Sequence, residues 1–267
     1  MAVTALRVAH RPREFVGVRG QDAASYLQAM VSNDVEALAI GDACGALLLT
    51  AKARVIAPLT VLRRGVNDFL LLTEPALGER VRSVLLRSRF AAKCEVELEE
   101  HESVIVLGEA AGISNHDYGI PAVEVLDVGH EATVDADELE LLRIRAGTPR
   151  WGREIDDRIL PAEAGLDRWA IDFEKGCYPG QEPIARQHYR GRVNRALRVL
   201  EIEGTELPEY DAELTSEAKV VGRVTSAAVE GDHVIALGFV RVEVPNDATL
   251  RVGELAVRQL DSPSPRP

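Results

Sequence analysis

The 267-residue sequence has few cysteines, few aromatic residues and no surplus of basic residues. Its three cysteines, Cys44, Cys94 and Cys177, are too few and odd in number for a disulfide scaffold, so we expect reduced thiols and a cytoplasmic protein. No apolar run reaches the roughly 18 residues of a membrane-spanning helix, and the first residues lack the apolar core of a signal peptide. The net charge of −12 disfavours a general nucleic-acid binder, because phosphate contacts need a surplus of Lys and Arg.

Sequence signatures of metal, nucleotide and hydrolase sites are missing as well. No two of the six histidines have metal-ligand spacing and no Cys-x-x-Cys occurs, so we expect no metal site. The sequence contains no Walker A loop, no Gly-x-Gly-x-x-Gly after a strand and no Gly-x-Ser-x-Gly elbow. A function must therefore be sought in other patterns.

The charge that is present is unevenly distributed. Hydrophobic residues make up 46% and charged residues 28%, which is typical of a globular protein. Residues 93–140 contain 14 acidic residues and one Lys, so this segment alone carries a net charge of −13. Residues 175–198 contain six basic residues and one Glu, a net charge of +5. An acidic total is thus compatible with anion binding at a locally basic site.

The hydrophobic pattern predicts an α+β protein. Apolar runs and period-two alternation predict strands at 43–50, 54–62, 69–73, 94–100, 104–107 and 123–126. Apolar spacing and capping residues predict helices at 22–31, 75–87 and from 135 or 137 to 146. Strand-like segments separated by Gly and Asp turns after residue 195 predict a small antiparallel β domain. Residues 149–191 show weak periodicity, and a long irregular segment of this kind is often functional.

The most informative stretch is Lys175-Gly176-Cys177-Tyr178-Pro179-Gly180-Gln181-Glu182. Its glycines permit a sharp turn and a close approach to a ligand. A cation at Lys175 and a helix beginning near Gln181 would favour the thiolate form of Cys177. The pattern fits a reactive or ligand-contacting thiol in a basic pocket. It equally fits a buried cysteine in a tight turn, with Lys175 pointing outward.

Other residues allow two interpretations each. The arginines between Arg186 and Arg198 either bind an anion or form a solvated face that pairs with the acidic segment. Trp151 and Trp169 either stack against a ligand or anchor the core.

Residues 175–182 resemble the Lys-Gly-Cys-Tyr/Phe-x-Gly-Gln-Glu signature of the YgfZ family of folate-binding proteins. This family is related to the glycine cleavage T-protein, an aminomethyltransferase. Weaker similarities follow in the order of the family, at 20–28, 32–35, 49–55, 145–166 and 190–195. The resemblance covers about residues 20–198, with a family-like β domain after it.

The resemblance implies an α+β, three-lobed, aminomethyltransferase-like fold around a central folate cavity. The first lobe would combine residues 1–50 with 141–195 and carry the signature. Residues 51–140 would form a ferredoxin-like lobe, residues 196–260 a C-terminal antiparallel β-barrel, and residues 261–267 a loose tail.

The function that the resemblance implies is that of an accessory protein for the assembly or repair of iron–sulfur enzymes, including tRNA-modifying ones. Its cofactor would be tetrahydrofolate or a derivative, with or without a polyglutamate tail, and its partners would include iron–sulfur proteins but no membrane. The residues implied to bind folate are Lys175, Cys177, Tyr178, Gln181, Arg186 and Glu124. Cys177 would serve as a nucleophile, a thiol donor or a cluster contact.

Two alternatives remain open. The first is a one-carbon transferase of the T-protein kind, in which an Asp-Asp pair supplies a carboxylate to folate. The aligned positions hold Ala57 and Pro58, which have no acceptor side chain, and Ala53 stands where the family has glycine. These departures favour the accessory role. The second alternative is a binding module that docks a protein or tRNA through residues 186–198.

Overall fold

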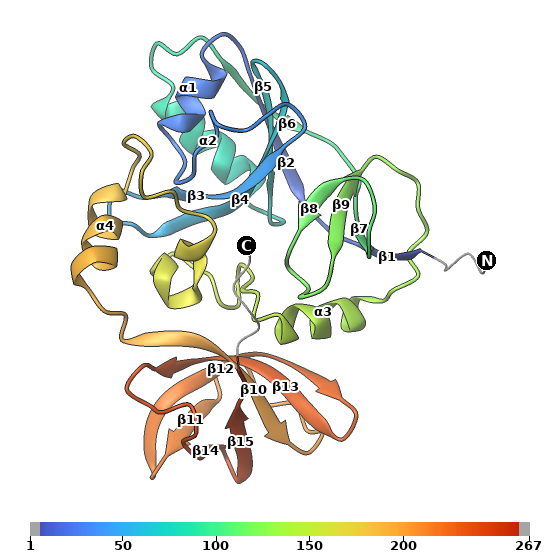
Figure 1. Ribbon diagram of the computed structural model, residues 1–267, viewed down its shortest axis with the longest axis vertical. Helices are drawn as coiled ribbons and strands as arrows, with labels where there is room; N and C mark the ends of the chain where they lie inside the picture. Colours follow the sequence, from blue (N-terminus) through green and yellow to red (C-terminus); the bar gives the residue numbers. More distant parts are fainter. Residues whose placement is uncertain (1–5, 262–267) are drawn as a thin grey trace.

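The chain forms two open antiparallel sheets and a closed barrel, which lie around the centre of the molecule (Figure 1). This computed structural model describes residues 6–261. The expected tail at 261–267 lies outside the described residues except for Asp261. None of the helices in the described part of the chain is long and apolar enough to cross a bilayer.

The first sheet has five strands in the order β3-β4-β5-β2-β6. Their bounds are β2 Glu14–Arg19, β3 Ala43–Leu49, β4 Val55–Gly65, β5 Asp68–Thr73 and β6 Glu95–Glu99. Helices α1 (Ala23–Gln28) and α2 (Gly78–Ser88) cover one face. Leu27 and Leu85 from these helices pack with Leu48 in a fully buried core. Burial of each such leucine contributes about 2 kcal/mol to stability.

The second sheet has four strands in the order β1-β7-β9-β8. Their bounds are β1 Arg7–His10, β7 Ser103–Leu107, β8 Ile113–Asn115 and β9 Ala122–Leu126. Helix α3 (Ala136–Arg145) follows and is capped by Asp135, whose carboxylate accepts the N–H of Glu138 at 2.8 Å. Leu139 of α3 packs in the core of this sheet, while Ile144 packs against the barrel. Helix α3 therefore joins the second sheet to the C-terminal barrel.

The barrel closes in the order β10-β13-β12-β11-β14-β15 with antiparallel pairs throughout. Its strands are β10 Arg195–Glu203, β11 Glu213–Ser216, β12 Lys219–Glu230, β13 His233–Arg241, β14 Leu250–Val252 and β15 Leu255–Gln259. Leu200, Val224 and Ala236 fill its interior. The expected α+β class with a C-terminal antiparallel barrel is thus confirmed.

An irregular segment connects α3 to the barrel and lies between the first sheet and the barrel (Figure 1). It contains the short 3-10 helices η1 (Pro161–Ala164) and η2 (Leu166–Arg168), followed by helix α4 (Gln181–Arg190). The sequence predicted both the irregular segment and the start of a helix near Gln181.

The structure differs from the expected arrangement in two respects. Five short strands, β1, β2, β8, β11 and β14, were not predicted, because none of them has more than two consecutive apolar residues. In addition, β3 and β4 pair along their lengths, so a boundary at residue 50 would fall inside one hairpin of the first sheet. The hydrogen bonds between strands decide which strands belong to each sheet, and the composition of the segments does not reveal this pairing.

Candidate functional site

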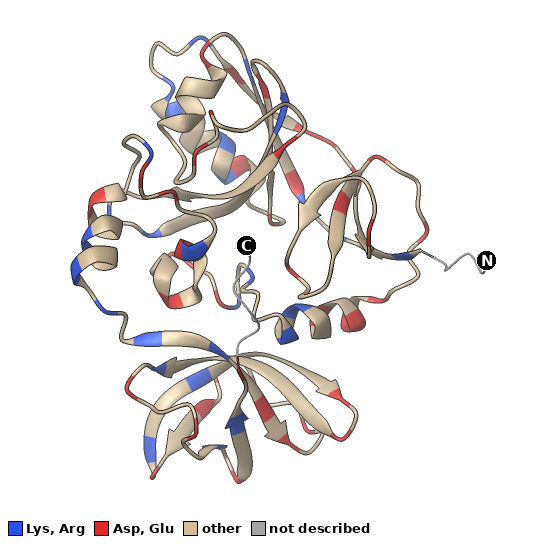
Figure 2. Cartoon of the chain, in the orientation of Figure 1, with Lys and Arg blue, Asp and Glu red and all other residues tan. Residues whose placement is uncertain are grey.

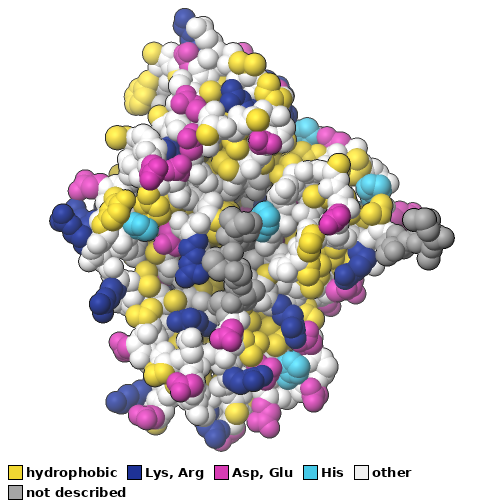
Figure 3. All heavy atoms as spheres, viewed as in Figure 1, with side chains coloured by type: hydrophobic (Ala, Val, Ile, Leu, Met, Phe, Trp, Pro, Cys, Tyr) yellow, Lys and Arg dark blue, Asp and Glu magenta, His cyan; other side chains and the backbone are white. Residues whose placement is uncertain are grey.

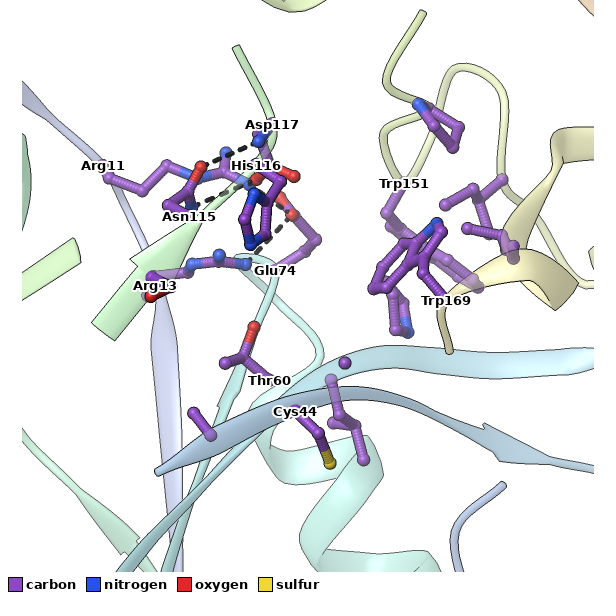
Figure 4. Close-up of a pocket in the computed structure, with 18 residues that line it drawn as sticks. Arg11, Arg13, Cys44, Thr60, Glu74, Asn115, His116, Asp117, Trp151 and Trp169 are labelled. Carbon is purple, nitrogen blue, oxygen red and sulfur yellow. Dashed lines mark hydrogen bonds and ion pairs between the residues drawn. The ribbon is translucent and has the colours of Figure 1, made fainter. Parts of the chain in front are cut away.

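A cavity of about 280 Å³ lies at the centre of the molecule, between the first sheet, the second sheet and the irregular segment (Figure 4). Its volume is near the lower end for small-molecule sites. Its walls differ in chemistry, with two indoles on one side and a group of charged and polar side chains on the other.

The apolar wall consists of Trp151 and Trp169, backed by Ile155 and Leu166. Trp169 lies directly against Gly45 of β3, where a Cβ would fall 2.1 Å from indole atom Cζ3. Only glycine therefore lets this ring rest on the strand. Exposed faces of large aromatic rings are suited to stacking with a flat heterocycle.

The opposite wall is charged. Arg11 and Arg13 lie in the segment that leads from β1 to β2, and Glu74 directly follows β5. Glu74 Oε1 accepts from Arg11 Nη2 at 2.7 Å and from Arg13 Nη1 at 3.3 Å. Asp117 lies 3.8 Å from Arg11 Nη2. Asn115 and His116 complete this wall, and His116 is exposed toward the cavity (Figure 4).

Arg13 has a second partner outside the cavity. Its Nε and Nη2 donate to the two oxygens of Glu124 at 2.9 and 3.0 Å, and Ser103 Oγ donates to Glu124 Oε1 at 2.6 Å. Burial by itself would raise the pKa of Glu124, but the ion pair with Arg13 and the Ser103 hydroxyl hold it below its usual value. Glu124, which is 1% exposed, thus anchors the charged wall to the second sheet and does not line this cavity.

The floor is formed by β3 and β4, where the Thr60 side chain points toward the cavity and the Cys44 thiol points away from it, into the core beneath the helices (Figure 4). Burial raises the pKa of the Cys44 thiol to about 12. Pro58 also lines the cavity, whereas Ala57 points into the core beneath the helices. One of the two positions aligned with the T-protein carboxylates therefore faces the cavity, but it has no acceptor.

Lys175 of the signature has an internal role. It is 8% exposed, and its Nζ donates to the backbone carbonyls of Gln28, Val31 and Asn33, each at 2.7 Å. Burial lowers the pKa of Lys175 to about 8. These bonds tie the signature loop to the end of α1. The interpretation in which Lys175 points outward is wrong.

The other predicted site residues are spread over different environments. Cys177 is exposed, so the interpretation as a buried cysteine is also wrong. Tyr178 is buried in the core beside Ile184 of α4, and burial raises its pKa to about 12. Gln181 Nε2 contacts the carbonyl of Lys175 at 3.5 Å. Arg186 is exposed and pairs with Glu182 at 2.8 Å. None of the six predicted residues lines the central cavity, and their roles toward folate remain predictions.

The signature loop packs against the turn that joins β3 to β4. Gly180 has φ +86°, and a Cβ on it would lie 2.6 Å from the carbonyl oxygen of Thr50. Ala53 in this turn adopts φ +57°, a left-handed conformation that favours glycine. The glycine expected here from the family pattern therefore corresponds to a real backbone requirement that Ala53 meets under strain.

The acidic residues of strand β6 are not all exposed. Glu95 and Glu97 of β6 are exposed, but Leu98 is 51% exposed and Glu99 is half-buried against Arg64. The arginines of residues 186–198 lie on α4, on β10 and in the segment between them (Figures 2 and 3). Within residues 6–261, no group of three or more His, Cys, Asp or Glu side chains is arranged to hold a metal ion.

Sequence reasoning missed the charged wall of the cavity. Its residues come from three segments far apart in the chain and belong to no motif: Arg11, Arg13, Glu74, Asn115, His116 and Asp117. Trp151 and Trp169 were identified as candidates for ring stacking, and the structure places both on one wall. Of the residues that line this cavity, the sequence therefore pointed only to the two tryptophans.

No protein-family model matches the chain. It is 26% identical to the tRNA-modifying protein YgfZ of Serratia proteamaculans, in an alignment that covers 92% of this chain and 87% of the relative. It is 28% identical to the mitochondrial iron-sulfur cluster assembly factor IBA57 homolog of Pyricularia oryzae, in an alignment that covers 92% of this chain and 74% of the relative.

The fold is that of the glycine cleavage system aminomethyltransferase T from Bartonella henselae, with a TM-score of 0.82 and 19% identity over 94% of this chain and 83% of that one. This likeness and the YgfZ relatives agree with the signature at residues 175–182. The chain is therefore similar in sequence to YgfZ proteins and IBA57 homologues, and it shares the fold of the glycine cleavage aminomethyltransferases.

Proposed function

We propose that this protein binds a reduced folate in the central cavity and acts in the cytoplasm as an accessory protein for the assembly or repair of iron–sulfur enzymes. The observation that carries the folate proposal is the pair of unlike walls, Trp151 and Trp169 facing Arg11 and Glu74. A pterin is a flat ring with a polar edge, so it requires an aromatic wall for stacking and a polar wall for its edge. The names of the relatives, which refer to iron–sulfur cluster assembly and to tRNA modification, support the accessory role.

In this proposal the indoles stack against the pterin and the charged wall contacts its polar edge. The glutamate end of tetrahydrofolate, with or without further glutamates, carries negative charge that arginine side chains recognise well. Cys177 has a separate task. Because it is exposed and outside the central cavity, it is available to an iron–sulfur protein partner.

The transferase alternative needs a general acid or base near the folate. The carboxylate of Glu154 is fully buried and bonded to Arg143 and Ser226, so it cannot serve. Asp172 accepts backbone N–H groups in the signature loop, and Glu182 is exposed on α4. Neither lines the cavity. None of these three residues can supply the group, and the two carboxylates that do line the cavity, Glu74 and Asp117, lie beside Arg11. The accessory role is favoured by Ala57 and Pro58, which stand where the T-protein has its carboxylates.

Calorimetric titration tests the folate proposal. We expect tetrahydrofolate and its stable 5-formyl derivative to bind at sub-millimolar concentration, and Trp169→Ala to weaken binding by about tenfold or more through loss of stacking, typically ~1–3 kcal/mol. Arg82→Ala serves as the control, because this side chain pairs with Glu79 on α2 and does not line the cavity. Absence of binding at 1 mM ligand, on the order of the weakest physiological affinities, would overturn the proposal.

Genetic complementation tests the accessory role. In a strain that lacks its own family member, the wild-type chain should restore the activity of an iron–sulfur enzyme that modifies tRNA, and Cys177→Ala should restore less. Normal rescue by Cys177→Ala would remove the special role of the thiol. Direct tRNA docking through residues 186–198 is tested by salt, since phosphate contacts by several arginines make binding steeply salt-dependent.

A further inference from the structure

We propose that Glu74 determines which heterocycle the central cavity accepts, by receiving the paired N–H groups of a 2-amino-4-oxo ring edge. This inference rests on the proposed folate function and adds to it the residue that selects the ring. Glu74 is a carboxylate in the cavity wall, 8% exposed, opposite the two indoles.

The register of the first sheet places this carboxylate beside the position where the T-protein pattern has one. Leu59 of β4 pairs with Thr73 of β5 in antiparallel fashion. Pro58 precedes the one and Glu74 follows the other, so both lie beyond the same pair and both line the cavity. Pro58 offers no acceptor. Glu74 supplies a carboxylate from the neighbouring strand.

The contacts of Glu74 leave part of it available. Both arginine contacts go to one oxygen, because Arg11 Nη2 and Arg13 Nη1 donate to Oε1. Among the described residues no hydrogen bond uses Oε2. Two guanidinium groups thus hold the carboxylate in place and balance its charge, while Oε2 remains for a donor from a ligand.

The chemistry of a carboxylate defines the ligand edge that fits. A carboxylate only accepts hydrogen bonds, and the N3–H and 2-amino groups of a pterin present two donors side by side. The 4-oxo group next to them needs a donor. On the same wall, Arg11 Nε is a buried donor that has no acceptor among residues 6–261. The wall thereby offers acceptors and a donor in the combination that this ring edge requires.

The stacking wall makes the selection possible. A ring that lies against Trp151 or Trp169 is held in a plane, so its edge points toward the charged wall across the cavity. A ring that is free to rotate could bring any N–H group to the carboxylate. A ring held in one plane cannot, so a ligand that lacks the 2-amino group leaves the carboxylate without a donor. Sites built from polar groups discriminate strongly against such ligands.

The test compares two ligands in calorimetry, 5-formyltetrahydrofolate and its 2-desamino-2-methyl analogue. Wild type should prefer the 2-amino ligand by at least about tenfold, as expected for hydrogen bonds to a charged group. Glu74→Gln should lose this preference to within about twofold. Glu163→Gln is the matched control, because it removes a carboxylate that is buried to the same degree and pairs with an arginine, Arg195, but does not line the cavity. It should retain the preference.

Each outcome has a distinct meaning. If wild type binds neither ligand, the proposed folate function fails and this inference fails with it. If wild type prefers the 2-amino ligand and Glu74→Gln keeps that preference, the inference is wrong while folate binding stands. The ratio of the two affinities separates recognition from a structural role, since a loosened cavity would weaken both ligands alike. Should thermal unfolding show that Glu74→Gln does not fold, Glu74→Asp decides, and it should reduce the preference by at least about threefold.

Discussion

The signature loop and the central cavity are built in opposite ways. The loop at residues 175–182 is contiguous and recognisable in the sequence. However, Lys175 donates its hydrogen bonds to three backbone carbonyls, and none of the predicted residues lines the cavity. The cavity is assembled from both sheets and the irregular segment, and no motif marks its charged wall. A motif therefore records the local geometry of a loop, while this ligand-sized space is a product of the whole fold.

The largest expected effect concerns the loop. Lys175→Met should lower the free energy of unfolding by about 3 kcal/mol, because one buried and two part-buried carbonyls lose their common donor. Arg186→Met is the control and should cost less than about 0.5 kcal/mol, since its ion pair is exposed. Urea denaturation measures both. If Lys175→Met is as stable as wild type but no longer binds folate, Lys175 belongs to the ligand site, and the distinction between a structural loop and a ligand-binding cavity is wrong.

The thiols of the two regions should differ in reactivity. At pH 8 we expect iodoacetamide to modify exposed Cys177 at least about tenfold faster than Cys44, since only the thiolate reacts. The pKa of Cys44 is raised to about 12, so less thiolate is present at pH 8 than for an ordinary thiol, and its rate should keep rising as the pH approaches 12. Peptide mass spectrometry gives both rates. Equal rates at pH 8 would contradict the description of Cys44 as a partly buried thiol that faces the core beneath the helices.

A smaller effect is expected at Gly45, against which the Trp169 ring packs. Gly45→Ala would place a methyl group 2.1 Å from the indole, so the ring must shift. We expect folate affinity to fall by about fivefold, roughly 1 kcal/mol of lost stacking, measured by calorimetry. Gly129→Ala is the matched control, because nothing lies within 4 Å of a Cβ there. Unchanged affinity in Gly45→Ala would show that Trp169 does not form the ligand wall.

The smallest effect is expected where the loop meets the β3–β4 turn. Ala53→Gly should change the free energy of unfolding by less than about 0.5 kcal/mol, because relief of a left-handed backbone is offset by a lost buried methyl and a more flexible unfolded chain. Thermal unfolding with calorimetry measures it. A gain well above 1 kcal/mol, about the cost of left-handed strain in one residue, would mean that strain at Ala53 dominates this contact.

Strands and helices were predictable where several residues repeat one pattern. The run from Ala43 to Leu49 and the helix beginning at Gln181 both lie where the sequence placed them. Strand β2 was missed because Gly17 interrupts its apolar run. The structure explains that glycine, since a Cβ there would lie 1.7 Å from the Glu99 carboxylate. A requirement imposed by a side chain 82 positions away leaves no local signal.

The sequence alone indicated the resemblance to YgfZ proteins, the α+β class and a C-terminal antiparallel β domain, because periodicity and a contiguous signature depend on neighbouring residues. It also identified Trp151 and Trp169 as candidates. Only the tertiary structure decided that Lys175 is internal, that Cys177 is exposed and that Glu74 faces the indoles. Those outcomes depend on which distant segments come into contact. Lys175 can donate to three backbone carbonyls, and Glu74 can pair with two arginines, only when the sheets have packed together.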